Sequence, residues 1–144
     1  MGLTAAVKTE GFETVTAESN SNWLNIDHSS FTSEQKQQLI GRKGESIDGI
    51  QYLANTILNL DRDAEQQNSF VIELDGYRVQ RNQELATLTE DAIAQVKSTG
   101  QEVEIPGLSS AERKQIHSLL EEIEGLSSES RGHEPERKLV VRPQ

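Results

Sequence analysis

The chain has 144 residues, 33% of them hydrophobic, which is enough for one ordinary domain or two small ones. It contains no cysteine, which excludes disulfides, cysteine zinc sites and thiol catalysis, and it has no apolar run of about 18 residues to span a membrane. The formal net charge of −10 argues against nonspecific binding of polyanions, because phosphate neutralisation dominates the affinity of such proteins.

The first 76 residues predict a small α+β domain. Thr32 and Gln35 have the spacing of a capping box, which begins a short helix. The helix after it carries apolar residues at helical spacing on one face, from Ile47 to Leu58. The predicted elements, in chain order, are a strand within 5–17, a turn at 20–22, a strand at 23–26, a helix over 33–40, the longer helix, a strand over 69–75 and a turn at 75–76.

Residues 77–144 predict a second α+β domain, which opens with a long connecting helix over 78–98. Its buried stripe is expected to contain Leu85, Leu88, Ala92 and Val96, and Gly100 to stop it. The remaining elements are a strand at 103–105, a helix with a capping box at Ser109 and Glu112 and a stop at Gly125, and two paired strands over 127–131 and 138–142. Apolar residues at helical spacing mark the buried face of that helix, namely Ile116, Leu119, Leu120 and Ile123.

The most informative segment is Gly41-Arg42-Lys43-Gly44, which we call the glycine loop. Neither glycine has a Cβ, so the main chain there can approach a ligand closely. The loop opens into a helix, whose first N–H groups lack partners and attract anions such as phosphate. Arg42 and Lys43 add positive charge at the same place, so the loop is a candidate grip on a nucleic-acid backbone.

The helix–loop–helix–strand order with strands before it resembles the K-homology (KH) fold in its type II form, a three-stranded sheet with helices on one face. In that family the Gly-x-x-Gly loop clamps about four nucleotides of backbone. The resemblance implies that the glycine loop binds RNA and that bases meet apolar residues beside it. The candidates for those base contacts are Leu39, Ile40, Ile47 and Ile50.

A second candidate site lies on the helix after Ser109. Arg113 and His117 are four residues apart, so they are neighbours on the helix surface. An Arg guanidinium can bind phosphate or stack on a base, and a His can hydrogen-bond or stack. The spacing and the strands that follow resemble a small single-stranded nucleic-acid-binding domain named for its Arg-x-x-x-His pair. Four further cations would extend its surface, namely Lys114, Arg131, Arg137 and Lys138.

The two units in this order resemble the bacterial Jag family (SpoIIIJ-associated protein), without that family's separate N-terminal Jag domain. The resemblance implies a cytoplasmic single-stranded RNA-binding protein, a small single-KH partner protein or self-association, and a role in cell elongation or division. No secretory signal opens the sequence, in agreement with that location. Two alternatives remain open, namely binding of single-stranded DNA and a protein–protein adaptor that dimerises through its KH surface.

Catalysis, metals and cofactors are not expected. His28, His117 and His133 lie far apart in the sequence, and no pair of them has the spacing of metal ligands on a helix. No P-loop, Gly-x-Ser-x-Gly or dinucleotide-binding fingerprint occurs. The sequence therefore favours a binding protein over an enzyme.

Overall fold

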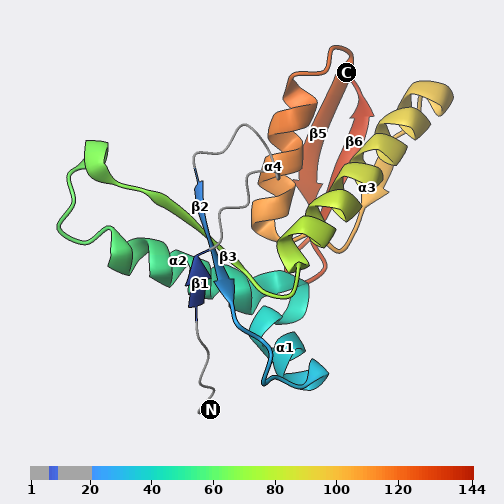
Figure 1. Ribbon diagram of the computed structural model, residues 1–144. Coiled ribbons are helices and arrows are strands. Elements are labelled where there is room, and N and C mark those ends of the chain that lie inside the picture. The colour runs from blue at the N-terminus through green and yellow to red at the C-terminus, as the bar shows by residue number, and fades with distance from the viewer. Residues whose placement is uncertain (1–6, 10–20) are drawn as a thin grey trace. The chain divides into compact units, whose positions relative to one another are not determined.

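The computed structural model describes residues 7–9 and 21–144, and most of the predicted first strand lies outside these described residues (Figure 1). The chain divides into two compact units, Met1–Gln80 and Arg81–Gln144. Each unit combines helices with a small sheet, which confirms the α+β class. The predicted domain boundary after residue 76 stays a prediction.

Unit 1 is built on a three-stranded sheet. Its elements are β1 (Val7–Thr9), β2 (Ser21–Ile26), α1 (Ser33–Ile40), η1 (Arg42–Gly44), α2 (Glu45–Leu58), η2 (Ala64–Gln66) and β3 (Ser69–Glu73). The strand order is β1-β2-β3, with β2 antiparallel to β1 and parallel to β3. The predicted turn at 20–22 is wrong for Ser21 and Asn22, because both residues pair with β3 as the start of β2.

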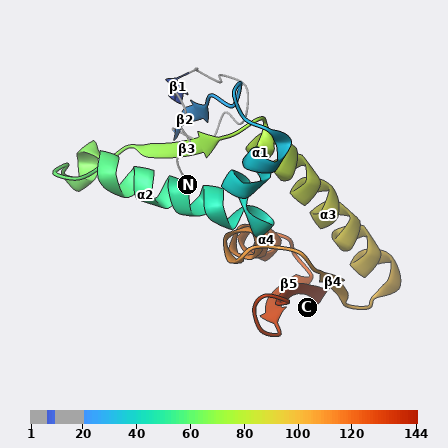
Figure 2. The same ribbon diagram turned by 90° about the horizontal axis from the view of Figure 1, so that it is seen from below.

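The core of unit 1 is small, and it uses only the beginning of α2. Ile47 is completely buried together with Ile72 and Leu74. Leu53 and Ile57, which the sequence placed on the buried face, are 57% and 62% exposed. The physical reason is that α2 meets β3 through a polar stripe instead (Figure 2).

That polar stripe consists of Gln51, Asn55 and Asn59, which we call the amide ladder. Their side-chain amides hydrogen-bond to main-chain groups of β3 and of Asn68 just before it. Four helical residues rise about 6 Å, and two strand residues rise about 6.6 Å. Side chains at i, i+4 and i+8 of a helix can therefore match alternate residues of a strand that runs alongside.

Unit 2 contains most of α3 (Tyr77–Thr99), followed by β4 (Val103–Ile105), α4 (Ser110–Glu121), β5 (Leu126–Arg131) and β6 (Lys138–Pro143). The strand order is β4-β6-β5, and β6 is antiparallel to both neighbours, which confirms the predicted strand pair. One core cluster joins both helices to the sheet: Leu85, Ala92, Val96, Ile105, Leu108, Ile116, Leu120, Leu126, Leu139 and Val141.

Two predicted core residues of unit 2 are wrong. Leu88 and Leu119 are 39% and 52% exposed, whereas Thr89 is buried in the stripe of α3. Burial of Thr89 is tolerated because its hydroxyl donates to the Leu85 carbonyl at 2.7 Å. The helices therefore turn a narrower apolar stripe inward than their sequences indicate.

The local start and stop signals are largely confirmed. Thr32 and Ser109 each form a full capping box with the residue three positions later. Gly100 has a φ of 67° directly after α3, as a helix-ending glycine does. Gly125 is not the stop of α4, because the helix ends at Glu121 and Gly125 instead precedes β5. Among the described residues, no helix combines the length and apolar character needed to cross a membrane.

Candidate nucleic-acid interface

The glycine loop is a sharp turn between two helices, as the sequence predicted. α1 ends where the Gly41 N–H donates to the Gln37 carbonyl at 2.8 Å. Gly41, Lys43 and Gly44 then all adopt positive φ values of 75°, 55° and 74°, and α2 begins at Glu45. The loop is therefore neither continuous helix nor extended chain, and it lies directly at the N-terminus of α2.

Close neighbours of its two glycines explain why glycine is needed. A Cβ on Gly41 would lie 2.8 Å from the main-chain nitrogen of Ser46. A Cβ on Gly44 would lie 2.3 Å from the hydroxyl oxygen of Tyr77, the first residue of α3. Gly44 is buried under that ring while Arg42 is exposed, so the loop is pinned at one end and presents a cation at the other.

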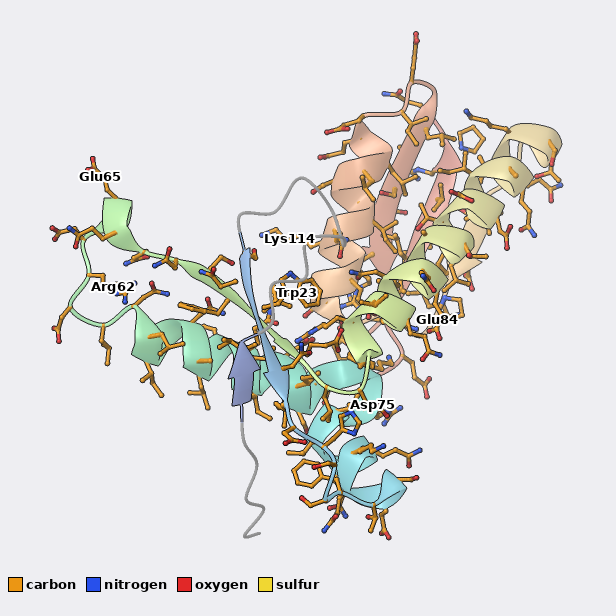
Figure 3. All side chains as sticks on the ribbon, viewed as in Figure 1. Trp23, Arg62, Glu65, Asp75, Glu84 and Lys114 are labelled. Carbon is orange, nitrogen blue, oxygen red and sulfur yellow. The ribbon has the colours of Figure 1, made fainter. Side chains whose placement is uncertain are left out.

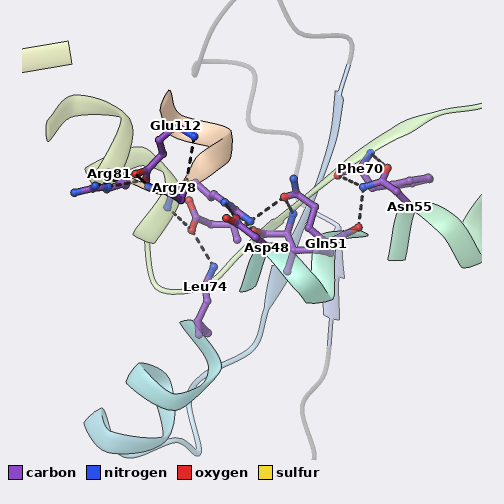
Figure 4. A network of polar contacts seen from close by, with 11 residues as sticks. Asp48, Gln51, Asn55, Phe70, Leu74, Arg78, Arg81 and Glu112 are labelled. Atoms are coloured by element: carbon purple, nitrogen blue, oxygen red, sulfur yellow. Dashed lines mark hydrogen bonds and ion pairs between the residues drawn. The ribbon is translucent and has the colours of Figure 1, made fainter. Parts of the chain in front are cut away.

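The charges around the loop leave Arg42 available. Within residues 7–9 and 21–144, its side chain forms neither a hydrogen bond nor an ion pair, and Lys43 beside it is half-buried. Two carboxylates lie in the first turn of α2, Glu45 and Asp48. Asp48 is neutralised by Arg78 at 2.5 Å, so the nearby negative charge is partly cancelled (Figure 4).

The predicted apolar groove residues are divided by the structure. Leu39, Ile40 and Ile50 are half-buried and pack against the core of unit 1. Ile47 has no exposed surface, because it forms the centre of that core with Ile72 and Leu74. For Ile47 the predicted base contact is therefore corrected to a core position, and for the other three it stays a prediction.

Arg113 is almost fully buried, with a side chain 6% exposed. Its guanidinium donates to the Leu108 carbonyl at 2.9 Å, to the Arg137 carbonyl at 3.5 Å and to the Glu134 carboxylate. These bonds tie α4 to the loop before β6, and a phosphate would have to displace Glu134 to reach the guanidinium. Direct contact of Arg113 with nucleic acid stays a prediction, and in this structure the residue organises that loop.

His117 and Lys114 are more accessible on α4. The His117 Nδ1 and the Ser128 hydroxyl oxygen are 2.6 Å apart, and Nε2 lies 3.2 Å from Glu121. Lys114 is exposed (Figure 3). Within the described part of the chain, Lys114 and Arg137 are among the few cations whose side chains contact no carboxylate; Arg42, Arg62 and Lys97 are further examples.

Arg131 and Lys138 lie on the other face of the sheet of unit 2. They share this face with Val140, since alternate strand residues point to opposite sides and Leu139 and Val141 face the core. Arg131 binds Glu102 at 2.9 Å and Glu129 at 2.6 Å, and Lys138 binds Glu104 at 2.8 Å. The structure thus separates these two cations from the α4 surface and pairs each with carboxylates.

These ion pairs shift the titration of their members. The hydrogen bond from Arg131 lowers the pKa of Glu102 below its ordinary value of 4.5 and raises the pKa of Arg131. The hydrogen bond to Glu104 raises the pKa of Lys138. All three groups are solvent-exposed, so the pairs contribute little to stability, and their cations reach a phosphate only by exchanging one anion for another.

Metal-binding and unsatisfied polar groups offer no further site. Among the described residues, no group of three His, Asp or Glu side chains is arranged to hold a metal ion. No buried side-chain polar atom there lacks a hydrogen-bond partner. The chemical potential of the described surface is therefore that of cations, main-chain amides and apolar side chains.

Sequence reasoning missed several residues that organise the site. Arg81 binds Glu112 through two nitrogens, at 2.8 and 3.0 Å, while Glu112 also accepts from the Ser109 N–H. Glu73 is buried and accepts from the Leu74 and Arg78 N–H groups at 2.9 and 2.8 Å. The amide ladder had a visible signal, since three amides recur every four residues along a helix.

Comparison with known proteins identifies the second half of the chain. Residues 83–143 match the R-three-H domain family, which is named for its Arg-x-x-x-His pair. The chain is 32% identical over 111 residues to RNA-binding protein KhpB of Lactiplantibacillus plantarum, which covers 77% of this chain and 34% of that protein. It is 28% identical over 103 residues to the protein of that name from Clostridium symbiosum, and 30% over 89 residues to that of Bacillus subtilis.

The alignments cover 72% and 62% of this chain for the Clostridium and Bacillus proteins, and 46% and 42% of those proteins. The chain thus spans less than half the length of each of these relatives. The family match falls where the sequence predicted an Arg-x-x-x-His domain, although the roles of Arg113 and His117 are not tested by it. The chain carries an Arg-x-x-x-His domain over residues 83–143 and has homologues, of the Jag family, that are named RNA-binding protein KhpB.

Proposed function

We propose that this chain binds single-stranded RNA without catalysis, through a type II KH-like unit 1 and the Arg-x-x-x-His domain. The observation that carries the proposal is the glycine loop, where a left-handed turn places the exposed Arg42 at the N-terminus of α2. Main-chain amides and a free cation at one point are the chemistry that phosphate oxygens need. The names of the three relatives support the same ligand class.

Unit 2 supplies the second contact in this proposal. Lys114, His117 and Arg137 belong to one region, because α4 carries the first two and Arg113 holds the main chain of the third. Arg113 therefore acts here by positioning the loop before β6. Arg131 and Lys138 contribute less, since each is already paired with a carboxylate.

Titration of a labelled RNA of about ten nucleotides against the full chain tests the proposal. Single-stranded RNA is expected to bind more tightly than the same sequence in a duplex, and single-stranded DNA serves as the competing ligand. Lys114→Asp with Arg137→Asp is expected to weaken binding and to lower the salt slope by about 0.7 for each phosphate that is no longer neutralised. Equal binding to duplex and single strand would remove the proposed mode.

The wider role that the Jag resemblance implies is a post-transcriptional regulator linked to cell elongation or division. Recovery of crosslinked transcripts from cells tests it. A set of transcripts enriched above those bound by an Arg42→Asp, Lys43→Asp variant is expected. Identical transcript sets for the two proteins would argue against a regulatory role that depends on the loop.

A protein-adaptor role is the second candidate, and a specific observation favours it. Four large apolar side chains on or just after α2 are exposed, namely Tyr52 at 73%, Leu53 at 57%, Ile57 at 62% and Leu60 at 62%. Contiguous apolar surface of this kind marks partner sites in soluble proteins. A second copy of unit 1 or a small single-KH protein is the proposed occupant.

Light scattering after size-exclusion chromatography tests the adaptor role. The wild-type chain alone, or mixed with such a partner, is expected to elute as a dimer that Leu53→Glu with Ile57→Glu dissociates. Leu88→Glu, which changes an exposed leucine on α3, serves as the control. A monomer under both conditions would leave RNA binding as the sole proposed function.

A further inference from the structure

Unit 1 has a sheet edge that is completely occupied by side chains. β3 is the last strand in the order β1-β2-β3, so one side of its main chain has no strand partner. Such an edge normally presents a row of free N–H and C=O groups. On β3 and just before it, residues Asn68, Phe70 and Ile72 turn these groups away from β2.

All six of these main-chain groups are hydrogen-bonded to side chains. Asn59 exchanges two bonds with the main chain of Asn68, at 2.9 and 2.8 Å. Asn55 exchanges two bonds with the main chain of Phe70, both at 2.8 Å (Figure 4). The Ile72 N–H donates to Gln51 at 3.0 Å, and Arg78 Nε donates to the Ile72 carbonyl at 3.1 Å.

The amides use the same pattern that a base would use. A side-chain amide presents an oxygen acceptor next to a nitrogen donor, which pairs with an N–H and a C=O of one strand residue. Adenine presents the same pair at N7 and N6, and this is why Asn and Gln read adenine bidentately. Asn55 therefore fills on Phe70 the place where a base edge would hydrogen-bond to the strand.

The amide ladder starts close to the glycine loop. Gln51 follows Gly44 by two turns of α2, a rise of about 10 Å. The C-terminal end of β3 lies at the same end of α2, since Arg78 joins the Ile72 carbonyl to Asp48. A polynucleotide held at the loop and running along α2 would therefore meet amide side chains instead of free main-chain groups.

We propose that the amide ladder makes the glycine-loop site tolerant of base sequence. It occupies the main-chain groups of β3 that would read bases, so the nucleic acid is held there through its backbone. This inference rests on the proposed RNA-binding function. Gln51, Asn55 and Asn59 are then the residues that determine specificity, because they keep the strand edge closed.

The test compares four eight-nucleotide RNAs, namely oligo(A), oligo(C), oligo(U) and a mixed sequence, by fluorescence anisotropy at one salt concentration. The full wild-type chain and the Arg42→Asp, Lys43→Asp variant are both titrated. The substitutions are expected to weaken all four RNAs by the same factor, within about threefold, because any preference of unit 2 cancels in that ratio. A bidentate base contact would instead make one RNA differ by about tenfold or more.

A tenfold preference that needs Arg42 and Lys43 overturns the inference, whether the variant binds the RNAs evenly or binds none of them. Even wild-type affinities support it when the variant loses all binding. Failure of the wild-type chain to bind any of the four RNAs overturns the proposed function and this inference together. A base preference limited to the loop overturns the inference alone.

Opening the edge gives a second test. Asn55→Ala frees the main chain of Phe70, so the spread of the four affinities is expected to widen by about threefold or more. Asn82→Ala, a substitution of an exposed asparagine on α3, is the matched control and leaves the spread unchanged. An Asn55→Ala variant that is folded by circular dichroism and binds the four RNAs as evenly as wild type overturns the inference.

Discussion

Substitution of Gly41 tests whether the shape of the glycine loop is required for the fold of unit 1. With φ at 75° and ψ at 178°, Gly41 occupies a backbone region that is essentially restricted to glycine. Forcing alanine into it costs about 1–3 kcal/mol. The new Cβ would also lie 2.8 Å from the Ser46 main-chain nitrogen, which cannot move without disturbing the first turn of α2.

Gly49 provides the matched control just beyond the loop. It lies inside α2, and no atom comes within 4 Å of the position that its Cβ would take. Gly49→Ala is therefore expected to stabilise unit 1 by about 0.5–1 kcal/mol, because alanine loses less backbone entropy in a helix. The same chemical change at two nearby positions is thus predicted to have opposite signs.

Urea unfolding followed by tryptophan fluorescence measures both effects. Trp23 is the single tryptophan of the chain and lies in β2, so its signal reports on unit 1 (Figure 3). The free energies of unfolding of the two variants are expected to differ by at least about 2 kcal/mol. A Gly41→Ala variant within about 0.5 kcal/mol of wild type would refute the argument that this turn needs glycine.

Three further predictions concern unit 2. Ser109→Ala removes the N-cap of α4 and is expected to lower the free energy of unfolding by about 1 kcal/mol, measured by far-ultraviolet circular dichroism in urea. Arg113→Ala leaves the Leu108 carbonyl unpaired, so a loss of about 1–3 kcal/mol is expected in the same assay, and an unchanged midpoint would contradict the structural role. Arg131 lowers the pKa of Glu102 in the folded state, so this carboxylate stabilises the protein above its ordinary pKa of 4.5 and loses that effect as pH falls through the depressed value. Acid unfolding of Glu102→Gln should accordingly depend less steeply on pH than that of wild type, and equal slopes would rule out this contribution.

Elements set by short-range chemistry were predictable from the sequence. The capping boxes at Thr32 and Ser109 depend on a residue only three positions away, and both form as expected. The two glycines of the loop predict a break between helices, because positive φ values favour glycine whatever the rest of the fold does. Strand pairing in unit 2 followed from the two short runs before and after a polar loop.

Features that depend on a distant partner were not predictable in the same way. Hydrophobic periodicity placed Leu53 and Ile57 in the core, but the sheet edge is met by Asn55 and Asn59 instead. Arg113 looked like a surface cation, because nothing in its local sequence shows that Leu108, Arg137 and Glu134 surround its guanidinium. Both errors arise because periodicity ranks side chains by polarity, while burial depends on whether polar groups find partners.

The role of the glycine loop is tested most directly by the affinity of the full chain for single-stranded RNA after reversal of the loop charges. Arg42→Asp with Lys43→Asp is compared with Arg62→Asp with Lys97→Asp, two exposed cations outside the loop whose reversal shifts the net charge of −10 equally. We predict that the loop variant weakens binding by about tenfold or more and the control by less than about threefold. Equal losses for the two variants, or no loss for the loop variant, would contradict the claim that the glycine loop holds the RNA backbone.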